Sequence, residues 1–75
     1  MEQELSFGQR AVGLTFNPSG DEKVLKLKQL CADAIDLLND LRGTERSEQA
    51  RLCSVAITEM QTAQMWGVKA VTWKD

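Results

Sequence analysis

The sequence predicts an all-α fold, an antiparallel helical hairpin preceded by an N-terminal arm and assembled into a homo-oligomer. Two long segments repeat apolar residues at alternating spacings of three and four, which is typical of helices that pack along a seam. A glycine-containing break separates these segments. A chain of 75 residues is short, so it buries only about 60% of its unfolded surface on its own. We therefore expect one domain over residues 1–75, with an arm at 1–20 and helices at 21–42 and 46–72.

The arm has no sustained apolar period, and it holds three of the five glycines and the only proline. Leu5 and Phe7 fit a short terminal helix, but Gly8 and Gly13 disfavour a long one. Both phenylalanines of the chain lie in this arm. They have two interpretations: the rings anchor the arm to the hairpin, which the residues alone favour, or Phe16 offers a flat face on which a base stacks.

Residues 17–22 are rich in turn formers and predict a loop that leads into the first helix. Ser19 and Glu22 have the spacing of a capping box, and acidic residues here complement the positive end of the helix dipole. Backbone N–H groups at such a terminus are also able to meet a phosphate, although this is a weak indication by itself.

The first helix carries a seam of six residues at heptad spacing: Val24, Leu27, Cys31, Ala34, Leu38 and Leu41. Leu25, Leu30, Ile35 and Leu37 add more apolar surface than one partner helix would cover. Three lysines, Lys23, Lys26 and Lys28, lie in its first turns, where the helix dipole does not favour them. A solvated basic face is the ordinary explanation, and a ligand contact is the alternative.

Gly43 is expected to end the first helix, and Thr44 or Ser47 to cap the second. Most residues of the seam on the second helix have small side chains, which predicts close helix packing. The seam consists of Cys53, Ala56, Met60, Ala63, Gly67 and Ala70. Other apolar residues are left on the remaining faces, which implies association of several chains: Leu52, Val55, Ile57, Met65, Trp66, Val68 and Val71.

Lys69 interrupts the apolar run of residues 63–73. An unpaired ammonium is costly to remove from water, so it requires an anion, a carbonyl or solvent. Either Lys69 reaches a wet rim, which the residues alone favour, or it faces a shared cavity that receives a ligand phosphate.

Composition excludes several functional classes. A net charge of −2 without a basic stripe argues against binding of DNA or RNA polymers, although a small anion held by a few cations is compatible with it. Histidine is absent, and Cys31 and Cys53 form no close pair, so we expect no metal site, no cofactor and two reduced, buried thiols. The longest apolar runs are too short to span a membrane, and the acidic start is unlike a signal peptide, so we expect a cytosolic protein.

The order of features resembles a known family. The arm carries Phe16-Asn17-Pro18, the first helix Leu27-Lys28, and the second helix Arg51-Leu52, then Ala56-Ile57-Thr58 and finally Met65-Trp66-Gly67-Val68-Lys69-Ala70. This order resembles the phage-encoded anti-CBASS sponge proteins, whose hairpin fold is shared with anti-Thoeris sponges. The resemblance implies a hexamer that sequesters cyclic oligonucleotide signals in the cytoplasm of the infected bacterial host. Such a protein blocks effector activation without degrading the signal.

The resemblance also implies two sites. Phe16 and Lys28 correspond to the arm ring and helix lysine that hold a cyclic dinucleotide between subunits. Arg10, Asn17, Pro18 and Ala70 are further candidate ligand-binding residues. Here the ring lacks a hydroxyl group. A second site, for cyclic trinucleotides, corresponds to Lys69. An arginine would bind phosphate there through two parallel hydrogen bonds, whereas a lysine acts as a point charge, so this second activity is the less firmly implied.

Two other classes remain as alternatives. A small oligomeric phage adaptor that binds a host or phage protein would use the same apolar faces and ignore nucleotides. A hydrolase is disfavoured, because the acidic residues are spread along helix faces and no nucleophile and base are paired: Asp33, Asp36, Asp40 and Glu59.

Overall fold

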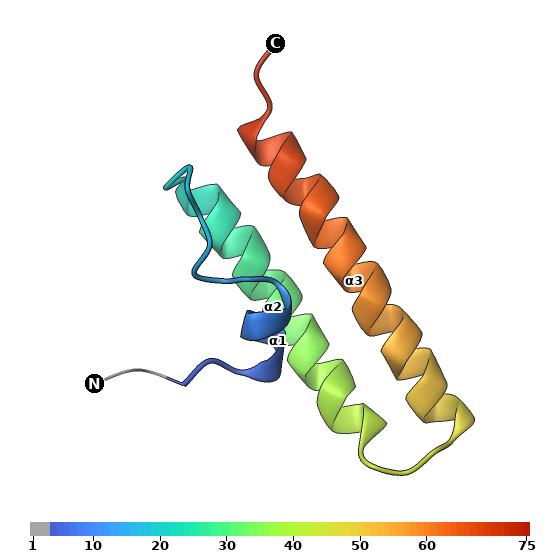
Figure 1. The fold of residues 1–75 in the computed structure, drawn as a ribbon. Coiled ribbons are helices and arrows are strands. Elements are labelled where there is room, and N and C mark those ends of the chain that lie inside the picture. Colours follow the sequence, from blue (N-terminus) through green and yellow to red (C-terminus); the bar gives the residue numbers. More distant parts are fainter. Residues whose placement is uncertain (1–3) are drawn as a thin grey trace.

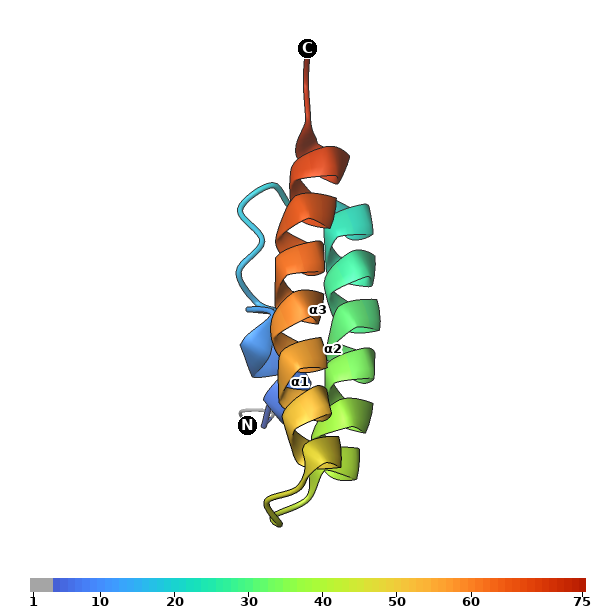
Figure 2. The same ribbon diagram turned by 90° about the vertical axis from the view of Figure 1, so that its right-hand side faces the viewer.

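The computed structural model describes residues 4–75, which form three helices and no strand. These are α1 (Phe7–Ala11), α2 (Glu22–Arg42) and α3 (Glu48–Thr72). Helices α2 and α3 run antiparallel and lie side by side, and the arm with α1 lies against one face of the pair (Figure 1). Figure 2 shows this arrangement as a thin layer of two helices with the arm on one side. The predicted all-helical hairpin is confirmed.

Each helix begins at a residue whose side chain satisfies a free backbone N–H group. A complete capping box does occur, but at α1, where Ser6 and Gln9 exchange side-chain to backbone hydrogen bonds of 3.1 and 2.9 Å. The capping box expected for Ser19 and Glu22 is wrong. Asp21 caps α2 instead and accepts the Lys23 N–H at 2.7 Å, because it lies immediately before the first helical residue.

The connection between the long helices is short. Gly43 ends α2 with a φ of 62°, a backbone angle that favours glycine. Of the two caps considered for α3, Ser47 is the one used, and its hydroxyl accepts the Ala50 N–H at 3.0 Å. Helix α3 then returns along the whole length of α2 (Figure 1).

The arm is an integral layer of the fold. The core consists of Val12 from the arm with residues of both long helices, Cys31, Ala32, Ile35 and Ile57. Gly8 lies so close to α2 that a side chain there would overlap the carbonyl oxygen of Ala32. Its N–H also donates to the carboxylate of Asp36 at 2.6 Å. Glycine at this position therefore lets the arm dock against the helix.

The predicted seam of α3 is partly wrong. Cys53 is buried and Gly67 packs on Leu27, but Ala63 and Ala70 are exposed. Ile57 and Gln64 are buried in their place. The arm covers α3 beside α2, and this second neighbour shifts the buried face away from a seam that one partner helix would produce.

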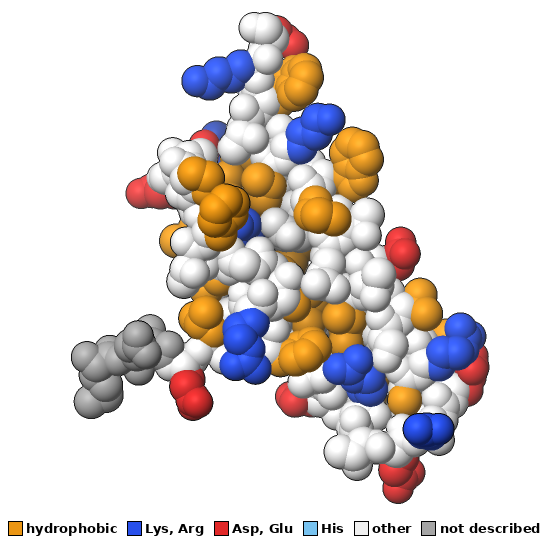
Figure 3. Space-filling model, viewed as in Figure 1, with side chains coloured by type: hydrophobic (Ala, Val, Ile, Leu, Met, Phe, Trp, Pro, Cys, Tyr) orange, Lys and Arg blue, Asp and Glu red, His pale blue; other side chains and the backbone are white. Residues whose placement is uncertain are grey.

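On α2 the same effect buries Lys28, Ala32 and Ile35, whereas Leu41 at the end of the predicted seam is exposed. Many large apolar side chains remain exposed on a single chain: Phe7, Phe16, Leu25, Leu30, Leu37, Leu41, Leu52, Val55, Met65, Trp66 and Trp73. Figure 3 shows, on the face that bears the arm, how hydrophobic side chains are interspersed with Lys and Arg. No helix within residues 4–75 is long and apolar enough to cross a membrane.

Candidate ligand-binding site

Two turns shape the part of the arm that follows α1. The Phe16 N–H donates to Gly13 O at 2.9 Å, and the Gly20 N–H donates to Asn17 O at 3.1 Å. Both glycines have positive φ angles, 63° and 66°, which an L-side chain disfavours. These turns carry the chain from α1 to the start of α2 across the face of the hairpin.

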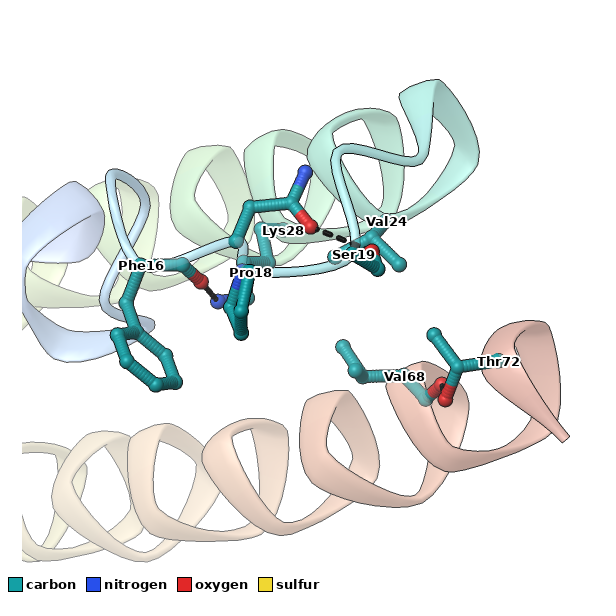
Figure 4. Close-up of a pocket in the computed structure, with 8 residues that line it drawn as sticks. Phe16, Pro18, Ser19, Val24, Lys28, Val68 and Thr72 are labelled. Atoms are coloured by element: carbon teal, nitrogen blue, oxygen red, sulfur yellow. Dashed lines mark hydrogen bonds between the residues drawn. The ribbon is translucent and has the colours of Figure 1, made fainter.

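Lys28 is buried beneath this segment, with 4% of its surface exposed. Its ammonium donates to Gly13 O at 3.0 Å and to Phe16 O, and lies 5.6 Å from the centre of the Phe16 ring (Figure 4). An ammonium has three N–H donors, so two of them hold the arm and a third remains. Within residues 4–75 no carboxylate lies within 4.0 Å of it. The buried charge therefore has dipolar partners but no neutralising anion.

Two hollows open beside Lys28. The first, which we call the loop pocket, has a volume of about 280 Å³ (Figure 4). It is lined by the loop that enters α2, by the start of α2 and by the end of α3: Phe16, Asn17, Pro18, Ser19, Val24, Lys28, Val68 and Thr72. The loop itself is tied down, because Ser19 donates to the Asn17 side chain at 2.7 Å and Asn17 donates to Asp21 O at 3.1 Å.

The second hollow, which we call the arm pocket, has a volume of about 530 Å³. Its walls come from α1 and the following turn, from α2 and from α3: Arg10, Ala11, Val12, Gly13, Phe16, Lys28, Gln64, Met65 and Val68. Phe16, Lys28 and Val68 belong to both pockets. Phe16 is 72% exposed, so a flat group in either pocket can reach its ring.

A third hollow, the indole pocket, lies toward the C-terminal end of α3. It has a volume of about 310 Å³ and is lined by Trp66, Lys69, Ala70 and Trp73. The exposed Lys69 ammonium lies 5.3 Å from the centre of the Trp66 ring and 5.8 Å from that of Trp73. Lys69 is thus at the surface of the single chain, held between two indoles.

Comparison with known families identifies the chain. The family described as Acb2/Tad1, hairpin domain, matches residues 9–72. The chain belongs to the Acb2/Tad1 hairpin family. This is the family of anti-CBASS and anti-Thoeris sponges, phage anti-defence proteins that bind cyclic nucleotides. No curated protein and no solved structure gave a significant match.

In this Acb2/Tad1 hairpin, the residues predicted for ligand binding fall into two groups. Five of the seven line the joined loop and arm pockets: Arg10, Phe16, Asn17, Pro18 and Lys28. Lys69 and Ala70 lie apart from them in the indole pocket. The structure therefore places Lys69, the residue implied for trinucleotides, apart from Phe16 and Lys28, the pair implied for dinucleotides.

Sequence reasoning missed three residues that α3 contributes to the loop and arm pockets. Gln64, Val68 and Thr72 follow one another at intervals of four residues, so they lie along one side of the helix and reach the pockets. A signal was present: Gln64 is a polar residue on the same side as the apolar Ile57. The heptad pattern places the seam at Ala63, one residue before Gln64.

The chemistry of these pockets favours binding of an anion with flat apolar parts. Cations and apolar side chains line the loop and arm pockets, and no Asp or Glu is among their described lining residues. Residues 4–75 also contain no group of three or more side chains suited to hold a metal ion. The lining thus provides charge, stacking and hydrogen bonds but no carboxylate to act as a general base.

Proposed function

We propose that this protein sequesters cyclic dinucleotides produced by CBASS-type bacterial defence, in the cytoplasm of the infected host, without degrading them. The observation that carries this proposal is the buried Lys28 ammonium, which has no anionic partner among residues 4–75 and faces two pockets that meet at an exposed phenyl ring. A phosphate oxygen would satisfy its third donor and neutralise its charge.

The ligand and the pockets are complementary in shape as well as charge. A cyclic dinucleotide has two negative phosphates and two flat bases on a small ring. Two pockets that share Phe16 and Lys28 give each base a place beside the phenyl ring, with a phosphate at the ammonium. Arg10 at the edge of the arm pocket supplies a second cation. Asn17 and Pro18 complete the wall of the loop pocket.

Assembly into a homo-hexamer is part of the proposal. Large apolar side chains of both long helices are exposed on the single chain, among them Leu30, Leu37 and Leu52. Burial of such surface between copies is favourable at about 25 cal/mol per Å². A site closed by a neighbouring subunit would exclude water from the Lys28 contact, and a preassembled site loses little entropy on binding.

The indole pocket is the candidate for cyclic trinucleotides. Lys69 lies there between Trp66 and Trp73, so one point charge is flanked by two surfaces suited to base stacking. Ala70 adds little bulk to the pocket floor. This activity is independent of the arm, because no residue is shared with the loop or arm pockets.

A phage adaptor that binds another protein is the second candidate, favoured by the exposed apolar surface. One experiment separates the candidates. The protein is mixed with a cyclic dinucleotide, isolated by gel filtration and denatured by heat, and the released nucleotide is analysed by chromatography. Intact nucleotide supports sequestration, a linear product indicates an enzyme, and failure to retain nucleotide supports the adaptor.

A further inference from the structure

Two charged or polar side chains are buried within residues 4–75, Lys28 and Gln64, and both line the arm pocket. The Lys28 ammonium donates hydrogen bonds to two backbone carbonyl groups. Gln64 is 7% exposed, and its amide makes no hydrogen bond to any other residue in the part of the chain that the structure describes. A mostly buried amide without a protein partner needs water or a ligand group to hydrogen-bond, so this side chain requires an explanation.

The surroundings of the Gln64 amide explain why it has no partner in the protein. No fully enclosed side-chain nitrogen or oxygen in residues 4–75 lacks a partner, so the unpaired amide retains an opening. Gln64 lines the arm pocket together with Lys28 and Phe16, so a ligand in that pocket is the group its amide can meet. Gln61, one turn earlier, differs in this respect, because its amide donates to Ala11 O at 3.2 Å and holds the arm. Gln64 thus presents a donor and an acceptor to whatever enters the pocket.

We propose that Gln64 recognises a nucleobase of the bound cyclic dinucleotide. Specifically, its amide hydrogen-bonds to the edge of an adenine that carries N6 and N7. This inference rests on the proposed function and adds a specificity-determining residue to its site. The amide oxygen accepts from the adenine N6 amino group while the amide nitrogen donates to N7. This is the bidentate pairing by which glutamine recognises adenine elsewhere.

The surroundings favour a base over a phosphate as the partner of Gln64. The amide is neutral, and Lys28 already provides the charge that a phosphate requires. The remaining walls near Gln64 include Val12, Met65 and Val68, which suit a flat apolar ring. A guanine in the same orientation would present two acceptors, N7 and O6, and would place O6 against the amide oxygen. The geometry therefore favours adenine over guanine at this position.

The test compares a cyclic dinucleotide that contains two adenines with its 7-deaza analogue, in which N7 is replaced by a C–H group. Calorimetry on the full-length protein should show that the analogue binds about tenfold more weakly, because an amide donor is left buried without a partner. In Gln64→Met, which keeps the length of the side chain, both ligands should bind with equal affinity.

Gln49→Met is the matched control, since it makes the same substitution at an exposed position of the same helix, outside the pockets. It should keep the tenfold difference between the two ligands. Equal affinity of the unmodified protein for the two ligands would overturn the inference, even if the Gln64 variant did not fold. A difference that persists in Gln64→Met would also overturn it. Binding of neither ligand by the unmodified protein would overturn the proposed function and this inference together.

Discussion

The Lys28 ammonium donates a hydrogen bond to the carbonyl oxygen of Phe16 and also lies 5.6 Å from the centre of the ring of the same residue. One cation on α2 thus fixes the backbone that presents the proposed stacking surface. Binding and arm anchoring are therefore coupled at Lys28, whereas the exposed Phe16 ring contributes chiefly to binding. Variants at the two positions should behave differently for this reason.

Lys28→Met keeps the aliphatic stem and removes the ammonium, so it should affect both folding and binding. Loss of the donor leaves the carbonyls of Gly13 and Phe16 without their partner, and the unfolding free energy should fall by about 1–3 kcal/mol. Urea denaturation measures this change. Lys23→Met, at an exposed position of the same helix, should be close to neutral. Equal stability of the two variants would contradict the role of Lys28 in holding the arm.

Two leucine substitutions on α3 separate packing within the hairpin from packing between chains. Gly67→Leu should destabilise the hairpin itself, because a side chain there overlaps Leu27. Ala63→Leu adds bulk to an exposed position and should leave the fold intact. If the face that carries Ala63 is a subunit contact, light scattering should show a smaller assembly for this variant. An unchanged assembly would place the contact elsewhere.

Lys69→Ala should leave dinucleotide binding unchanged and weaken trinucleotide binding by about tenfold, because a charge-assisted contact is worth roughly 1.5–3 kcal/mol. The separation of the indole pocket from the loop and arm pockets is the reason. Calorimetry with both ligands measures the effect. Loss of dinucleotide affinity in this variant would show that the pockets act together.

The buried thiol of Cys31 predicts a dependence of stability on pH. Desolvation raises the pKa of Cys31 above its ordinary value of 9.0, so the folded state holds the proton to a higher pH than the unfolded state does. Its contribution to stability is present below pH 9 and is lost as the pH rises through the folded pKa. The stability difference between the parent and Cys31→Ala should therefore shrink above pH 9. A constant difference from pH 7 to pH 10 would contradict this.

Much of the fold was predictable because it depends on local pattern. The two long helices follow from apolar periodicity, and the break at Gly43 follows from a residue that tolerates positive φ. The buried face of α3 was not predictable from two helices alone. It depends on where the arm docks, and that docking is decided by the close approach of Gly8 to Ala32, a tertiary contact with no periodic signal.

Only those residues of the candidate site that match the family resemblance were predictable from the sequence. Phe16 and Lys28 do lie together, but composition alone favoured ordinary structural explanations for both. The sequence offers one signal for Gln64, a polar residue on the side of the helix that carries Ile57, but its significance lies in being buried, unpaired within the described residues and next to Lys28 in one pocket. These three properties belong to the folded chain.

The most direct test of the account is calorimetry of a cyclic dinucleotide with the parent protein and with Phe16→Ala, with the oligomeric state of both checked by light scattering. The account predicts that the parent binds and that Phe16→Ala, with an unchanged assembly, binds at least tenfold more weakly, because base stacking is worth about 1–3 kcal/mol. Equal affinity of the two proteins would contradict it, and so would the absence of any binding by the parent.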